Sequence, residues 1–220
     1  MPTLSTAAPG NKPLSLGLLE IHGLTPALVA LDALDKSASV RLLQYELNDS
    51  YGVVLKFAGE TSAVRAALEN GEQAARAMGA EVVADILPAP SEEALRAILA
   101  PREINPLLEA PVVQFPNYEN LDSDNITFME TYAIGLIETQ GFTAVFEAID
   151  AACKAADVQV IGREKLGGGY ITVLLKGDVA AVTAAVEAGS ARVEGLGKLI
   201  AAHVIARPSE AVLSLVPKAP

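Results

Sequence analysis

The sequence is short of basic residues, cysteine, histidine and aromatic side chains. Its 220 residues hold 16 Lys and Arg against 27 Asp and Glu, which gives a formal net charge of −11. Nucleic acids and anionic membranes are bound through a basic face, so we expect neither as a partner. One cysteine and two histidines exclude a disulfide framework and provide no recognisable set of metal ligands. We therefore expect neither a metal nor another cofactor.

Long uncharged apolar runs are also missing, although 51% of the residues are hydrophobic. A membrane-spanning helix needs about 18 or more such residues, and acidic residues such as Glu20, Asp32, Glu138 and Asp150 interrupt every run. The sequence also starts without a cationic and apolar leader, so we expect a protein that is neither exported nor inserted in a membrane. Aromatic residues make up only 5%, which suits small cores and extended subunit contacts.

The chain contains an internal repeat. An offset of 118 residues places residues 16–95 over residues 134–213 without a gap. The offset pairs identical residues along its whole length: Asp32 with Asp150, Lys36 with Lys154, Gly59 with Gly177, Gly71 with Gly189, Gly79 with Gly197, and Pro90 with Pro208. Chance matches would scatter over many offsets, so the pattern predicts two copies of one domain.

Both copies predict the same order of strands and helices. The first is expected to form a strand at 15–21, a helix from Thr25, a hairpin of strands at 39–46 and 52–58, a helix to about Met78, a strand at 81–87 and a short helix after Pro90. The second repeats these elements 118 residues later. The order β-α-β-β-α-β-α predicts an α+β fold, with a mostly antiparallel sheet and helices on one face.

The repeat divides the chain into four parts. We expect a disordered tail at 1–13, a first domain at 14–96, an extended linker at 97–132 and a second domain at 133–216. Four prolines at five-residue intervals lie in the linker: Pro101, Pro106, Pro111 and Pro116. A proline inside a helix removes a hydrogen bond and clashes with the preceding turn, so the linker cannot be one helix.

Four segments of the second copy carry a family resemblance. They are Gly-Leu-Ile-Glu-Thr at 135–139, Glu-Lys-Leu-Gly-Gly-Gly at 164–169, Lys-Gly-Asp-Val-Ala-Ala-Val at 176–182 and His-Val-Ile-Ala-Arg-Pro at 203–208. Together they resemble the bacterial microcompartment shell domain, and the first copy resembles it more weakly in the same register. The chain is thus similar to tandem-domain shell proteins of the unpermuted strand order.

That resemblance implies a structural protein and not an enzyme. Single-domain members form flat hexamers with a central pore, and tandem members form homotrimers whose six domains mimic the hexamer. The implied partners are two further copies of the chain, other microcompartment shell proteins, and small polar metabolites that cross the pore. The implied location is the microcompartment shell inside the cytoplasm.

The same resemblance assigns the loop between the second and third strands to the pore. The matching residues are Asn48, Asp49, Ser50 and Tyr51 in the first copy, and Leu166, Gly167, Gly168 and Gly169 in the second. Gly168 takes the position nearest the axis. The first loop lacks the glycine run. From the residues alone, three glycines are also what a tight hairpin turn with positive φ requires, with no role in transport.

Three residues match the positions at which neighbouring tiles meet in the family. Lys36 and Lys154 match its edge lysine, and Arg207 matches its edge arginine, which the first copy replaces with Ala89. A lysine near a helix C-terminus has a simpler explanation as well, because its charge complements the helix dipole. We expect Cys153 to be a small core residue, since it shares a helical face with Phe142, Phe146 and Ile149.

The sequence offers no catalytic motif. It contains no Gly-x-Ser-x-Gly, phosphate-binding loop or dinucleotide fingerprint, and Gly167–Gly169 falls in a hairpin and not at a strand-to-helix turn. An alternative function stays open at this point: a tandem-domain protein that binds a small metabolite or regulates another process, with its ligand between subunits. The two hypotheses differ in assembly, because only shell tiles form sheets or closed shells.

Overall fold

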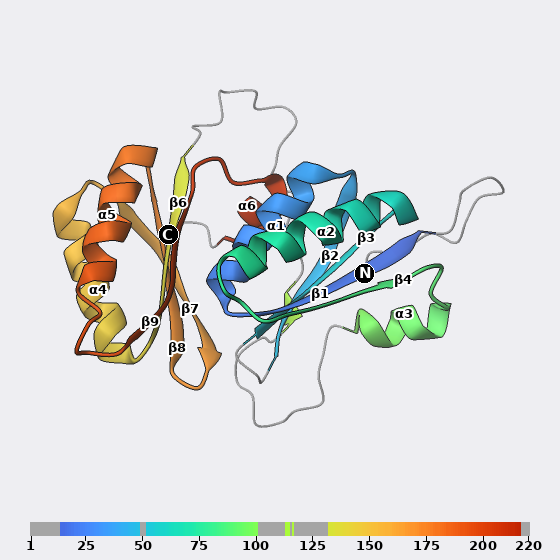
Figure 1. Cartoon of the computed structure of the whole chain (residues 1–220), viewed down its shortest axis with the longest axis horizontal. Helices are drawn as coiled ribbons and strands as arrows, with labels where there is room; N and C mark the ends of the chain where they lie inside the picture. Colours follow the sequence, from blue (N-terminus) through green and yellow to red (C-terminus); the bar gives the residue numbers. More distant parts are fainter. Residues whose placement is uncertain (1–13, 49–51, 101–112, 115, 117–131, 217–220) are drawn as a thin grey trace.

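In the computed structural model, the described residues are 14–48, 52–100, 113–114, 116 and 132–216. They form two α+β domains side by side, shown in Figure 1 in blue to green for the first and in yellow to red for the second. The expected tail at 1–13 and most of the expected linker at 97–132 lie outside the described residues.

The first domain has the predicted order of elements. They are β1 (Ser15–His22), α1 (Leu24–Ser37), β2 (Val40–Leu47), β3 (Gly52–Gly59), α2 (Thr61–Ala77), β4 (Val82–Leu87) and α3 (Glu92–Ile98). Its sheet is antiparallel in the order β4-β1-β3-β2-β5. The last strand, β5 (Val113–Gln114), comes from the segment expected to be a linker, and it pairs with Tyr45 and Glu46 of β2. This edge strand was not predicted.

The second domain repeats the order. Its elements are β6 (Ala133–Gln140), α4 (Phe142–Ala155), β7 (Gln159–Gly167), β8 (Tyr170–Gly177), α5 (Val179–Ala191), β9 (Lys198–Ile205) and α6 (Glu210–Leu215). The strands form an antiparallel sheet in the order β7-β8-β6-β9. The predicted fold, two copies of one α+β domain, is confirmed.

Repeated glycines let the two long helices of each domain pack closely. A Cβ on Gly189 of α5 would lie 2.7 Å from the backbone oxygen of Ala148 in α4 and 2.7 Å from the Cδ1 atom of Ile137. The equivalent Cβ on Gly71 of α2 would lie 3.4 Å from the backbone oxygen of Ala30 in α1. Only a residue without a side chain permits the approach at Gly189, which explains one of the pairs that revealed the repeat.

The two domains meet through a helix of the first domain and the sheet of the second domain. Helices α4 and α5 cover the face of the second sheet that points away from the first domain, while α1 packs against β6, β9 and α6 (Figure 1). One hydrophobic cluster therefore runs through the first core and into the second domain, where its members are Ile134, Leu136, Ile161, Leu166, Leu174, Ile205, Ala211 and Val212. The sheet of the second domain is thus buried on both faces.

The expected core position of Cys153 is wrong. Cys153 is exposed, and so are Phe142 and Phe146 on the same face of α4. The core of the second domain instead takes a stripe of smaller residues on α4: Ala144, Val145, Ala148 and Ala152. The face with Phe142 and Phe146 is equivalent to the face of α1 with Leu24 and Leu28, which the second domain covers.

No helix in the described part of the chain is long and apolar enough to cross a membrane.

Candidate functional site

The hairpin between β7 and β8 forms a tight and exposed turn. Gly167 pairs with Tyr170, so Gly168 and Gly169 are the two central residues. Their φ values are +52° and +82°, and Gly167 has a φ of +91°. Positive φ at both central residues is the requirement of a type I′ turn, which explains the glycine run. The turn presents backbone groups to solvent, because Gly167 and Gly168 are exposed.

This turn is held against the end of β6. The N–H of Gly141 donates to the backbone oxygen of Gly169 at 2.9 Å, and Nε2 of Gln140 donates to the backbone oxygen of Gly168 at 3.2 Å. Two hydrogen bonds to one short turn restrict its movement. The exposed backbone is therefore a fixed feature of the surface.

Leu166 differs from the three glycines that follow it. Its side chain is only 5% exposed, and it belongs to the hydrophobic cluster that joins the two domains. The neighbouring Lys165 is exposed, and its Nζ atom lies 5.4 Å from the centre of the Phe142 ring. The part of this loop that faces solvent is thus Gly167–Gly169.

The equivalent hairpin of the first domain is closed by a side chain. The N–H of Asn48 donates to the backbone oxygen of Gly52 at 2.9 Å, and the Oδ1 atom of Asn48 accepts from the N–H of Gly52 at 2.8 Å. Its Nδ2 atom donates to Oε1 of Glu20 at 2.5 Å. The predicted pore residues Asp49, Ser50 and Tyr51 lie outside the described residues.

A buried carboxylate connects the two domains. Glu138 of β6 is fully buried, and its two oxygens accept from the backbone N–H groups of Leu24 at 3.0 Å and Thr25 at 2.9 Å. These groups open α1, whose N-cap residue is Gly23 and therefore has no side chain to cap the helix. Burial raises the pKa of Glu138, while the two backbone donors act in the opposite direction.

The start of α6 rests on acidic residues of α1. Oδ1 of Asp32 accepts from the N–H of Ser209 at 2.8 Å, and Oδ2 of Asp35 accepts from the N–H of Ala211 at 3.2 Å. Lys36 donates to Oδ2 of Asp32 at 2.7 Å and to the backbone oxygen of Arg207. We use the name domain contact for the whole interface between the two domains. It includes these hydrogen bonds, the hydrogen bonds of Glu138, and the buried side chains of Leu24 and Leu28.

The predicted edge residues occupy two places. Lys36 and Arg207 lie together, because the Lys36 ammonium reaches the Arg207 backbone across the domain contact. Lys154 lies on the far side of the second domain, exposed, with its Nζ atom 2.5 Å from Oδ2 of Asp150. The hydrogen bond from Lys154 to Asp150 raises the pKa of Lys154.

The role of Glu138 does not follow from the family resemblance, nor from its place among the charges that interrupt apolar runs. An acid that directly follows an apolar run within a strand is itself a signal, because a buried carboxylate needs hydrogen-bond donors. The repeat pairs Glu138 with Glu20 of the first domain, so the same signal occurs twice.

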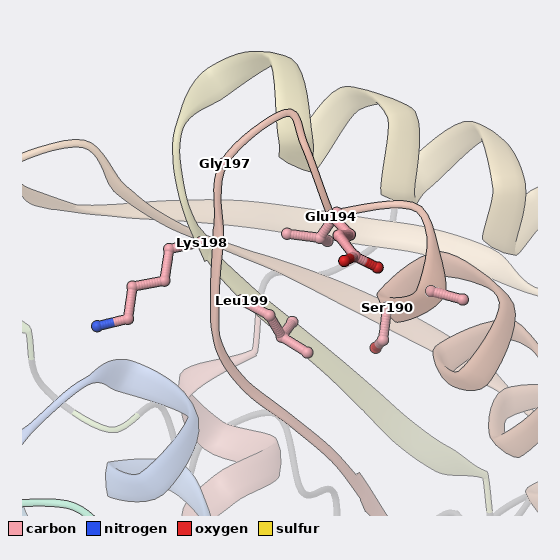
Figure 2. Close-up of a pocket in the computed structure, with 7 residues that line it drawn as sticks. Ser190, Glu194, Gly197, Lys198 and Leu199 are labelled. Atoms are coloured by element: carbon pink, nitrogen blue, oxygen red, sulfur yellow. The ribbon is translucent and has the colours of Figure 1, made fainter.

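A shallow depression of about 350 Å³ lies between the end of α5 and the start of β9 (Figure 2). It is lined by Ser190, Ala191, Val193, Glu194, Gly197, Lys198 and Leu199. None of the predicted pore or edge residues contributes to this lining. Among the described residues, no three His, Cys, Asp or Glu side chains are grouped in a way that could hold a metal ion.

Comparison with known proteins agrees with the repeat. The BMC domain family matches residues 15–90 and again residues 133–208. The chain is 47% identical over 90 residues to the bacterial microcompartment shell protein PduA of Citrobacter freundii, covering 41% of this chain and 97% of PduA. It is 51% identical over 89 residues to the major carboxysome shell protein CsoS1A of Halothiobacillus neapolitanus, covering 40% of this chain and 91% of CsoS1A.

A solved structure of a microcompartment protein from Desulfitobacterium hafniense DCB is 27% identical, with a TM-score of 0.36, and the match covers 90% of this chain and 96% of that one. The two family matches include both hairpins, helix α1 and Glu138, but the second match ends before Ser209 and α6. The chain is a tandem BMC-domain protein, and it belongs to the family of bacterial microcompartment shell proteins.

Proposed function

We propose that three copies of this chain form a pseudohexameric tile of a microcompartment shell, with a central pore for small polar metabolites. The role is structural, and the location is the shell inside the cytoplasm. This chain contains two family domains. The shell proteins PduA and CsoS1A match it over 97% and 91% of their own length with about one domain each. Three copies of this chain therefore supply as many domains as six copies of a single-domain protein.

The observation that carries the proposal is the asymmetry of the domain contact. The second domain contributes α6 and the face of its sheet that α4 and α5 do not cover, whereas the first domain contributes α1. Such a contact joins two different surfaces. The surface of α4 that corresponds to the joined surface of α1 is exposed. The corresponding sheet face of the first domain is partly covered, because Lys56 and Gln44 donate to the backbone oxygens of Ile98 and Ala100 at and after the end of α3. Contacts of this kind repeat head to tail and close into a ring when the rotation allows it. Six domains in a ring correspond to three chains.

The exposed Gly167–Gly169 turn supports the pore. Its φ values and its two hydrogen bonds hold three backbone units toward solvent without any side chain. In a trimer, three such turns would alternate with three loops that contain Asn48, Asp49, Ser50 and Tyr51. Backbone dipoles and short polar side chains favour hydrated polar molecules over apolar ones.

We propose Lys154 and Arg207 as contacts with neighbouring tiles and with other shell proteins. Both are exposed in the single chain. Lys36 has a different position, because its ammonium already binds Asp32 and the Arg207 backbone within the chain. We therefore give Lys36 a smaller share in the contacts between tiles.

Electron microscopy of the purified chain, alone and mixed with a single-domain shell protein, tests this function. A shell tile forms flat sheets or enters closed shells, and averaged images show six lobes around a central opening. A metabolite-binding regulator stays a discrete particle under the same conditions, and that outcome would reject the shell role.

A further inference from the structure

We infer that Glu20 of one chain caps helix α4 of the next chain, in the way that Glu138 caps α1 within a single chain. This inference rests on the proposed trimer and specifies the contact between its chains, which we call the chain contact. The second domain would supply α4 to it, and the first domain of the neighbour would supply the sheet face that carries Glu20.

The start of α4 matches the start of α1 except that it is uncovered. Gly141 occupies the N-cap with a φ of +126°, as Gly23 does for α1 with a φ of +91°. The backbone donors of Leu24 and Thr25 are bound by Glu138, and Thr25 is fully buried. The equivalent residues of α4 are Phe142 and Thr143, and both are exposed. The first N–H groups of a helix need acceptors, and a carboxylate is the strongest of these.

The side chains beside this helix start point to a covering partner as well. Leu24 and Leu28 of α1 are 3% and 4% exposed, whereas Phe142 and Phe146 of α4 are 44% and 49% exposed. The two phenylalanine rings lie 6.3 Å apart and form one apolar patch. The face of α4 is thus exposed although it carries larger apolar side chains than the buried face of α1. An exposed apolar patch of this kind is typical of a contact between subunits.

Glu20 is placed to make the equivalent bond. It occupies in β1 the position that Glu138 occupies in β6, and it pairs with Val54 and Val83 as Glu138 pairs with Thr172 and Ala201. Glu20 is partly exposed, and Nδ2 of Asn48 binds its Oε1 atom at 2.5 Å. That hydrogen bond holds the carboxylate in position before a partner arrives, which lowers the entropy cost of binding.

Charge complementarity favours a second copy of this chain as the occupant. In the domain contact, burial raises the pKa of Tyr45, and the charge of Glu164 adds to this. The offset of 118 residues pairs Glu164 with Glu46 and Tyr45 with Arg163. The chain contact would therefore bring the cation Arg163 near Glu46, whose carboxylate Lys56 also binds within its own chain.

The two cations near the phenylalanine patch agree with this. The Cζ atom of Arg163 lies 5.6 Å from the centre of the Phe146 ring, and Nζ of Lys165 lies 5.4 Å from that of Phe142. At the equivalent positions the domain contact has Tyr45 and Leu47, which carry no positive charge. The chain contact would thus gain two positive charges that the domain contact lacks at these positions, and added salt should weaken it.

The test compares variants that remove the acceptor or the donor. Glu20→Ala deletes the carboxylate, and Thr143→Pro deletes the backbone N–H at a first-turn position, where a helix tolerates proline better than in its interior. Thr143→Ala is the matched control, since it keeps the N–H. Native mass spectrometry over a dilution series measures the concentration at which half of the trimer dissociates. Circular dichroism checks that each monomer is folded.

We expect Glu20→Ala and Thr143→Pro each to raise that concentration at least tenfold, while Thr143→Ala leaves it within twofold of the wild-type value. The wild-type chain could be trimeric while the half-dissociation concentration of both variants equals that of the wild type. The capping role of Glu20 would then be wrong, and the proposed trimer would stand. If the wild-type chain is never a trimer, the proposed function itself is wrong.

A measurement on the unmodified chain guards against variants that fail to fold. Hydrogen exchange of the amides of Phe142 and Thr143 is followed above and below the dissociation concentration. Capping predicts protection in the trimer and loss of that protection on dilution. Equal exchange at both concentrations contradicts the inference, whatever the variants do.

Discussion

The carboxylate of Glu138 and the backbone N–H of Thr25 lie 2.9 Å apart, although 113 residues of chain separate them. This bond fixes the sheet of the second domain to the first helix of the first domain. It also shows which surfaces of the two domains meet within the chain. A buried carboxyl group needs hydrogen-bond donors, and the start of α1 supplies them inside an otherwise apolar contact.

Replacing Glu138 should change the pH dependence of stability. Burial raises the pKa of Glu138 above its usual 4.5, so the folded protein keeps a proton on this carboxyl at pH values where the unfolded chain has lost it. Stability from this group therefore falls as the pH rises above 4.5, until the pH passes the raised pKa. Thermal melts in that window should show this slope for the wild-type chain and lose it in Glu138→Gln.

The alanine variant at the same position should be less stable at every pH. It leaves the buried N–H groups of Leu24 and Thr25 without their acceptor, which costs about 1–3 kcal/mol for each unsatisfied group. Chemical denaturation measures the difference. A Glu138→Ala chain as stable as the wild type would mean that the domain contact does not depend on this carboxylate.

The close approach of the helices makes a prediction about two glycines. Gly189→Ala places a Cβ 2.7 Å from the Ala148 backbone oxygen, so it should destabilise the second domain by about 1–3 kcal/mol. Gly71→Ala is the control, because its nearest contact is the flexible end of Leu19 at 3.0 Å and its helix backbone contact is 3.4 Å. Equal stability losses in the two variants would contradict this account of the repeat.

Bulk at the exposed turn should close the proposed pore. Gly168→Trp appears three times in a trimer, so its steric effect on a narrow opening is tripled. Because φ is +52° at this position, any side chain adds strain of about 1 kcal/mol or somewhat more, and Gly168→Ala is the control for that cost. The measurement is metabolite flux across assembled shells. Normal flux through shells that contain the Trp variant would remove the turn from the pore.

Acidic replacements at the proposed tile edge should prevent the formation of sheets. Lys154→Glu combined with Arg207→Glu should abolish sheets, since both side chains are exposed and would repel a neighbouring acidic tile. For Arg207→Glu alone, the melting temperature of the trimer should stay nearly unchanged, because an exposed substitution costs about 0.5 kcal/mol or less. Lys154 is the repeat partner of Lys36, which lies in the domain contact, so Lys154→Glu alone shows whether Lys154 also stabilises the chain contact. Dissociation of the trimer by this pair would instead place Lys154 and Arg207 in the chain contact.

The sequence predicts the strands, helices and hairpins well, because each copy confirms the other. A glycine run between two strands predicts a tight turn, and Gly71 and Gly189 at equivalent positions predict a special requirement for glycine. Both predictions concern structure within one domain and do not depend on what covers that domain. The positive φ values of Gly167, Gly168 and Gly169 are of this kind.

The failures concern what covers each surface. Cys153 shares its face with Phe142 and Phe146, and periodicity cannot tell a face covered by the domain's own core from one left for a partner. The family resemblance predicts that Leu166 lines the pore, and the structure adds that its side chain packs in the cluster between the domains. Strand β5 was hidden in a proline-rich segment, where a two-residue pairing has no periodicity to detect.

The mass of the native assembly in solution shows directly whether six domains form one ring. We expect a single species of three chains, each of 22.8 kDa, that persists across micromolar concentrations and weakens as salt is added. A stable monomer or dimer over the same range would contradict the ring of six domains, and with it the pore and the chain contact.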